Sequence, residues 1–231
     1  MPLKNIYRTS PSIITTADYN QFVTGAGVKT FYPCVNNDSA GVNYHLNENP
    51  VYTDEAFTDT VSTGLATGGT YSAESNVDFD TSAFSKTRVI NGTAVLNMVF
   101  GWSDAGLDIQ SASVKLSAQL FAWDGTTETA LSSLIDSQDM GFAGVGVADR
   151  TMLTLEIPVV NKRVPAGSKL RLNIITYGKD ADISAKGRVG FLHNPTGYDA
   201  NRTTTVDLLI WGDPPTEYTH VAKLFVPFKQ F

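Results

Sequence analysis

The residues that could carry out chemistry are few in this sequence, and they form no recognisable catalytic or metal-binding motif. Histidine occurs three times, at positions too scattered for a metal site of the usual spacing: His45, His193 and His220. Cys34 is the only cysteine, which excludes an intrachain disulfide and indicates a small core residue in a strand-like segment. We therefore expect no bound metal ion and no cofactor.

Acidic residues offer a second class of candidate sites. The pairs Asp78/Asp80 and Asp180/Asp182 could each give two oxygen ligands to calcium, but neither is followed by further ligands at calcium-loop spacing. We interpret both pairs as parts of solvated loops. The segment Gly101-Trp-Ser-Asp-Ala only half matches a nucleophile elbow, and nothing in the sequence selects a carboxylate pair for glycoside hydrolysis. The sequence thus predicts a protein that is not an enzyme.

Aromatic residues near strand ends are the remaining candidates for binding. Trp102 and Trp211 end predicted strands, whereas Trp123 lies with Phe121 on the otherwise polar side of its strand. Such side chains can stack against sugars or anchor a protein interface. The alternative interpretation is that the second sheet, or an arm of the chain, covers them.

The segments that would position these residues alternate with a period of two, which predicts β-strands. Residues 114–123 alternate most clearly, and Asp124-Gly125 directly after them is typical of a hairpin turn. Segments with 3.6-residue periodicity and helix caps are nearly absent. The sequence therefore predicts an all-β fold, a β-sandwich or jelly roll. We expect further strands at 29–36, 88–102, 128–135, 151–160, 169–177, 188–193 and 204–211.

The two ends of the chain differ from its middle. We expect residues 1–28 to form an extended N-terminal arm and residues 29–231 a β-sandwich domain with long loops, best defined over 86–212. Residues 47–85 are rich in small polar residues and cannot easily bury a face of their own, so we interpret them as arms or long loops. The apolar tail 221–231 is either the final strand of the sandwich or an arm that contacts another surface.

Composition excludes several partners. Hydrophobic residues make up 42% of the chain and charged residues 17%, which is the opposite of a disordered composition. The net charge is -6 and the 17 basic residues are scattered, so we expect no nucleic-acid binding. No apolar run is long enough for a signal peptide or a bilayer span, so we expect a cytoplasmically made protein without membrane contact.

Residues 112–210 resemble the jelly roll of the galactose-binding-like group. The resemblance lies in the ordered segments SVKLSAQLFAWDGTTETAL, TLEIPVV, VPAGSKLRLNI and GFLHNPTGYD. The same order occurs in the C-terminal β domains of some α/β-hydrolase peptidases and esterases. The resemblance covers less than half of the chain and no hydrolase domain, so it implies the fold and no catalytic residue.

Residues 25–55, GAGVKTFYPCVNNDSAGVNYHLNENPVYTDE, are similar to β-rich head auxiliary and decoration proteins of tailed bacteriophages. This resemblance implies a virion structural protein, a capsid decoration or cement protein or a related head or tail component, assembled in a host cytoplasm. The implied partners are other virion proteins, either the major capsid protein or neighbouring copies in a homo-oligomer. We expect the assembly interface at apolar residues of the arm and tail: Ile13, Ile14, Tyr19, Phe22, Phe225, Phe228 and Phe231.

A carbohydrate-binding β-sandwich module is the alternative function. In that case the glycan would be held by the candidate residues Trp102, Trp123 and Trp211.

Overall fold

The computed structural model of the 231-residue protein describes residues 27–38, 41–49, 59–61, 65, 69–104, 112–141, 148–179, 187–193 and 222–229. These residues form thirteen strands and contain no helix, as expected for an all-β fold. Within them, then, there is no helix that could span a membrane. The strands are β1 (Gly27–Asp38), β2 (Gly41–Asn47), β3 (Asp59–Val61), β4 (Ser72–Asp80), β5 (Arg88–Asp104), β6 (Ser113–Trp123), β7 (Glu128–Ala130), β8 (Ile135–Asp136), β9 (Met140–Gly141), β10 (Ala148–Val164), β11 (Lys169–Lys179), β12 (Gly187–Leu192) and β13 (Lys223–Phe228).

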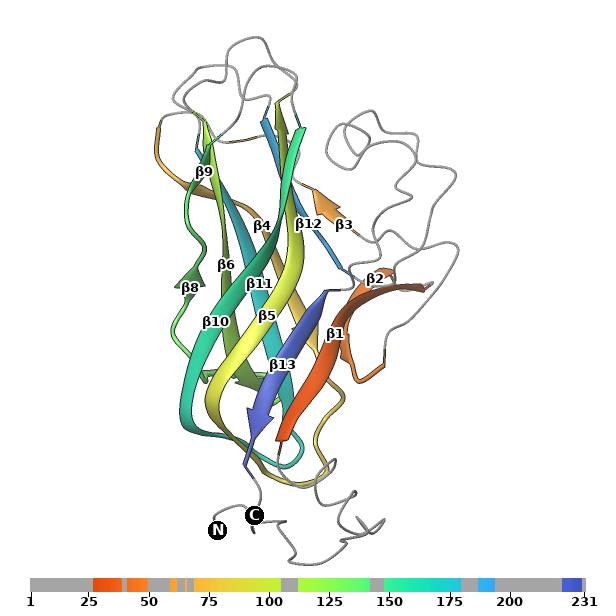
Figure 1. The fold of residues 1–231 in the computed structure, drawn as a ribbon. Helices are drawn as coiled ribbons and strands as arrows, with labels where there is room; N and C mark the ends of the chain where they lie inside the picture. The colour runs from red at the N-terminus through yellow and green to blue at the C-terminus, as the bar shows by residue number, and fades with distance from the viewer. Residues whose placement is uncertain are drawn as a thin grey trace, which may run out of the picture.

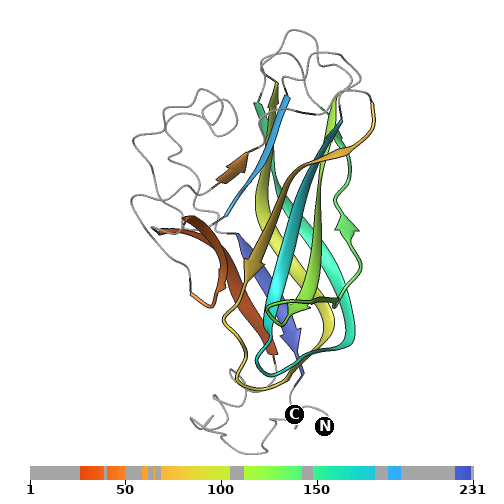
Figure 2. The same cartoon turned by 180° about the vertical axis from the view of Figure 1, so that it is seen from behind.

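The strands form two layers that face each other across a common core (Figure 1). The first layer is built on β5, which pairs with β10 along one edge and with β12 and β13 in succession along the other. The second layer has the order β2-β4-β11-β6, and the outer edge of β6 is covered by the short strands β7, β8 and β9. Figure 2 shows this second layer from outside. The architecture is the predicted β-sandwich, made from one curled mixed sheet.

Strand β1 joins the two layers. Its first half pairs with β13 in the first layer, and its second half pairs with β2 in the second. Residues 223–228 of the tail are therefore a strand of the sandwich, with hydrogen-bonded neighbours on both edges, β1 and β5. This is one of the two interpretations that the sequence left open for residues 221–231.

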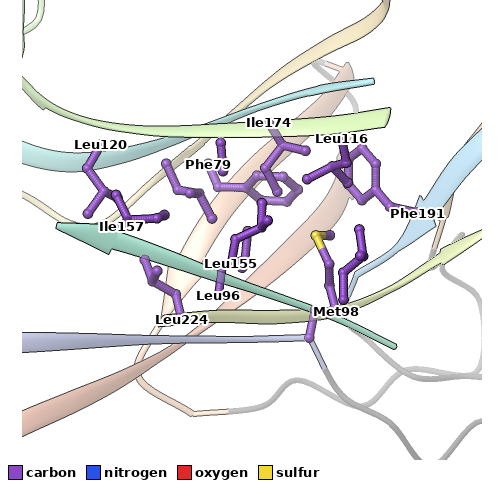
Figure 3. Packing of buried hydrophobic residues seen from close by; sticks show 14 of the residues in the cluster. Phe79, Leu96, Met98, Leu116, Leu120, Leu155, Ile157, Ile174, Phe191 and Leu224 are labelled. Atoms are coloured by element: carbon purple, nitrogen blue, oxygen red, sulfur yellow. The ribbon is translucent and has the colours of Figure 1, made fainter. Parts of the chain in front are cut away.

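The core consists of inward-facing residues from both layers. β6 and β11 have the same alternating burial pattern, because successive side chains of a strand point to opposite faces. Leu116 and Ile174 of the second layer meet Leu96 and Leu155 of the first in Figure 3, and all four are at most 5% exposed. The cluster also includes residues outside the range 86–212, such as Phe79.

Strand β4 corrects the interpretation of residues 47–85 as arms or loops only. Residues 72–80 form an inner strand of the second layer, paired with β11 through antiparallel hydrogen bonds. Val77 and Phe79 point into the core, whereas Asp78 and Asp80 point outward. The sequence analysis did not predict this strand because one of its sides is polar. The carboxylates on that side are paired with a residue almost a hundred positions away, which the sequence alone does not indicate.

The turn after β6 matches the prediction from Asp124-Gly125. The Asp124 carboxylate accepts hydrogen bonds from the backbone N–H groups of Thr126 and Thr127 at 2.8 and 2.7 Å, and these bonds lower its pKa. Gly125 has a φ of 103°, which favours glycine. The returning segment forms β7 and β8 rather than the single continuous strand expected for 128–135.

Candidate functional site

The described residues contain no group of three or more histidine, cysteine, aspartate or glutamate side chains that could hold a metal ion. His193 is 2% exposed and makes edge-to-face ring contacts with Tyr44, Phe79 and Phe191. It is thus part of the aromatic core. Within the described residues, the two outer surfaces of the sandwich differ in chemistry.

The outer surface of the second layer carries a network of charges centred on Arg171 of β11. Its Nε and Nη2 atoms donate to the two carboxylate oxygens of Asp80 at 2.7 and 2.8 Å, a bidentate geometry. Its Nη1 atom donates to Asp78 at 3.2 Å and to Glu128 of β7 at 2.6 Å. One guanidinium therefore connects β4 and β7 to β11 from the outside of the sheet.

Trp123 of β6 lies opposite Glu128 of β7 and packs against Arg171. The guanidinium carbon of Arg171 is 4.4 Å from the centre of the Trp123 ring, within the range of a cation–π contact. Hydrogen bonds from Arg171 to Asp80 raise the pKa of the arginine above its ordinary value, so it stays charged at every physiological pH. The network continues along the sheet, where the Asn173 amide donates to Asp78 at 2.7 Å. We refer to Asp78, Asp80, Trp123, Glu128 and Arg171 as the Arg171 network.

The chemistry of the Arg171 network is that of a closed structural cluster. All three carboxylates already accept hydrogen bonds from the same cation, and one face of the tryptophan ring is covered by it. The sequence analysis missed this cluster. The alternation Val77-Asp-Phe-Asp80 was the available signal, since it places two carboxylates on one side of a strand whose other side is apolar.

The outer surface of the first layer carries apolar side chains on four of its strands, with polar ones between them. We define the outer apolar face as seven residues of β1, β5, β10 and β13, which lie side by side in Figure 1: Val28, Val95, Met152, Pro158, Val160, Phe225 and Pro227. Val28, Met152 and Val160 are 63, 46 and 72% exposed, and they are three of the four large apolar side chains that the described residues expose. Pro227 is held close to the sheet because its ring lies over Gly92, which has no side chain.

The predicted assembly residues fall in different places. Phe225 lies on the outer apolar face and is half-buried. Phe228 packs against the core, with its ring 6.2 Å from Phe31 and 6.0 Å from Phe84. The other five predicted assembly residues lie outside the described residues: Ile13, Ile14, Tyr19, Phe22 and Phe231.

The three tryptophans are also separated from one another. Trp102 is 5% exposed and packs beside Phe100 in the core, so its ring is not available to a glycan. Trp123 is half-buried in the Arg171 network. Trp211 lies outside the described residues.

Comparison with known proteins gives a fold and no family. No family model matches the sequence, and no curated protein matches it. One similar solved structure is an α-amino acid ester hydrolase, with a TM-score of 0.51 and 9% identity over 87% of this chain. The chain spans only 36% of that hydrolase, so the similarity concerns the fold of one part of it.

Two further structures are similar at a lower level. A CocE/NonD family hydrolase from Staphylococcus aureus has a TM-score of 0.47 and 9% identity, over 90% of this chain and 37% of its own. The VP2 subviral particle of infectious bursal disease virus has a TM-score of 0.30 and 13% identity, over 85% of this chain and 41% of its own. The resemblance to hydrolase β domains, expected from residues 112–210, is confirmed by the first structure for the fold alone.

Proposed function

We propose that this protein is a non-enzymatic structural subunit of a virus particle, either a capsid decoration or cement protein or a related head or tail component. The observation that carries the proposal is the contrast between the two outer surfaces. On the outer surface of the second layer, the charged side chains of the Arg171 network are paired with one another, as is usual where a sheet meets water. The outer apolar face exposes Val28, Met152 and Val160, as is usual where a sheet meets another protein.

The edges of the sandwich favour contact through a face rather than through strand addition. The edge of β10 that pairs with no described strand contains Pro158, which has no N–H to donate, and a bulge where Asn161 has a φ of 48°. These features oppose the pairing of another strand with this part of β10. The edge of β6 is already covered by β7, β8 and β9. Tail residues 223–228 have a paired strand on each side, so they cannot add a strand to a neighbour.

Composition and the phage-like N-terminal segment support the virion as the assembly in question. Charged residues are only 17% of the chain, which suits a protein whose surface is partly covered by neighbours. The proposed partners are the major capsid protein or other virion proteins, with assembly in the host cytoplasm.

The test is to purify virus particles from the native source on a density gradient and to quantify this protein across the gradient. We expect it to migrate with the particles in a fixed ratio to the major capsid protein, also after a high-salt wash. Recovery only in the low-density fractions, with particles that lack it, would overturn the virion proposal.

A glycan-binding module has weaker support. Of its three candidate tryptophans, only Trp123 is a partly exposed residue in the described part of the chain, and Arg171 covers one face of its ring. A glycan would therefore have to use the other face or displace the arginine. Binding to a glycan array that is lost in Trp123→Ala, with the fold intact, would favour this function instead.

A further inference from the structure

We propose that the outer apolar face is the contact surface of a symmetric homodimer, in which the side chain of Glu156 of each copy reaches diagonally to Lys223 of the other. The inference rests on the assembly role proposed above and names one of the partners, a second copy of this chain. It is argued from the order of the strands, the positions of two charges and the size of the face.

Strand β5 lies along the middle of this face. β10 pairs with one edge of β5 and β13 with the other, both in antiparallel orientation. Glu156 of β10 lies opposite Val95 of β5, and Val95 lies opposite Phe225 of β13. The next row of outward residues is Thr154, Asn97 and Lys223. An anion on one flank of β5 is thus matched by a cation on the other flank, one row away.

The side chains of Glu156 and Lys223 have no ion-pair or hydrogen-bond partner among the residues that the structure describes, unlike most charges on the opposite surface. Glu156 lies beside Val95, and Lys223 lies beside Asn97, one row from Phe225. An unpaired charge near exposed apolar side chains is stabilised most by a partner surface that offers both the opposite charge and apolar area.

A twofold axis along β5 supplies that partner. In a symmetric dimer the same patch is used by both copies, so the patch must be complementary to itself. Rotation by half a turn about an axis that runs along β5, between the two facing sheets, exchanges the flanks. β10 of one copy then lies over β13 of the other, with Glu156 over the row of Phe225. Lys223 lies one row further, about 6.6 Å along the strand, so the two long side chains meet diagonally, once on each side of the axis. The outward residues of β5, Val95 among them, face their own copies.

The face is large enough for a small interface. From Met152 to Val160 it is about 26 Å long at a rise of about 3.3 Å per residue, and its four strands span about 19 Å at about 4.8 Å each. The planar area is therefore at most about 500 Å², because β13 begins level with Thr154 and does not reach Met152, but corrugated side chains present more accessible surface than a plane. A stable interface of standard size buries about 800 Å² per partner. We thus expect a dimer of moderate affinity, formed at micromolar protein concentration.

Charge reversal tests the pairing directly. Sedimentation velocity of the full-length protein is measured from about 1 to 100 µM, a range chosen because interfaces below the standard size are typically weak. Glu156→Lys brings two cations together on both sides of the axis, and Lys223→Glu brings two anions together there. We expect each single variant to weaken dimerisation at least tenfold. Lys86→Glu makes the same charge change on an exposed loop and should leave it unchanged.

The decisive sample is an equimolar mixture of Glu156→Lys and Lys223→Glu. In a mixed dimer both contacts become attractive again, so the mixture should dimerise as well as the wild type although neither variant does so alone. Circular dichroism confirms that each variant is folded. A wild type that stays monomeric at 100 µM, or a mixture that stays monomeric beside a dimeric wild type, would overturn the homodimer. Either result leaves the virion proposal to the particle gradient, which does not depend on dimerisation.

Discussion

Removing the guanidinium of Arg171 directly tests how the outer surface of the second layer holds its strands in register. Arg171 binds Asp80 in a bidentate pair, and their side chains are only 12 and 15% exposed. Breaking such a shielded pair by removing one partner costs about 3–5 kcal/mol. Asp78 and Glu128 are 38 and 39% exposed, so each of their contacts contributes at most about 1 kcal/mol. Because water reaches part of the cluster, we expect Arg171→Ala to cost about 3 kcal/mol, at the lower end of that range.

The assay is thermal and urea unfolding followed by circular dichroism. For a domain of this size each kcal/mol lowers Tm by about 2–4 °C, so the expected fall is about 6–12 °C. Arg171→Lys keeps the charge but cannot make the bidentate pair, so it should recover only part of the loss. Arg163→Ala removes an exposed arginine from the end of β10 and should change stability by less than about 0.5 kcal/mol. A loss below about 1 kcal/mol in Arg171→Ala would show that the network does not hold β4 and β7 to β11.

Three further predictions concern the core, the backbone and pH. Phe79→Ala removes a ring that is fully buried between the layers and should cost about 3–5 kcal/mol in urea unfolding. Gly92→Ala forces a residue with a side chain to a φ of 130° and puts its Cβ 3.2 Å from Pro227, so the urea midpoint should fall by the equivalent of about 1–3 kcal/mol. Hydrogen bonding from Lys115 lowers the pKa of Asp136 in the folded protein. The ionised carboxylate of Asp136 therefore stabilises the fold above the unfolded pKa of about 3.9, and this stabilisation is lost as the pH falls through the folded pKa. Unfolding at pH 2–5 should therefore show a smaller loss of stability below about pH 4 in Asp136→Asn than in the wild type.

Several strands could be read from the sequence because each has an alternation of its own. Residues 114–123 and 169–177 alternate clearly, and the structure has β6 and β11 there with matching burial. Asp124 and Gly125 predicted the turn between β6 and β7 because their side-chain and backbone preferences are local. The lack of helix-forming segments predicted the all-β class in the same way.

The candidate sites depended on contacts between distant strands, so the sequence placed them less well. Trp102 ends an apolar segment and was a candidate for a surface aromatic, but β10 and β12 flank β5 at this position and the ring is buried. Asp78 and Asp80 were interpreted as a solvated loop, but Arg171 neutralises them from the neighbouring strand. Met152 and Val160 are exposed because the opposite side of β10 faces the second layer, and the sequence alone does not indicate which side that is.

The sequence by itself determined the class of fold, because the period of two, the turn residues and the missing helix signals are properties of neighbouring residues. Only the tertiary structure decided that the tail is an inner strand between β1 and β5, since that position results from pairing with residues 27–31 and 90–97. It also decided which surface carries satisfied charges and which exposes apolar side chains. The physical reason is that a strand has two chemically distinct sides, and the order in which strands pair determines which sides are brought together on each surface of the sandwich.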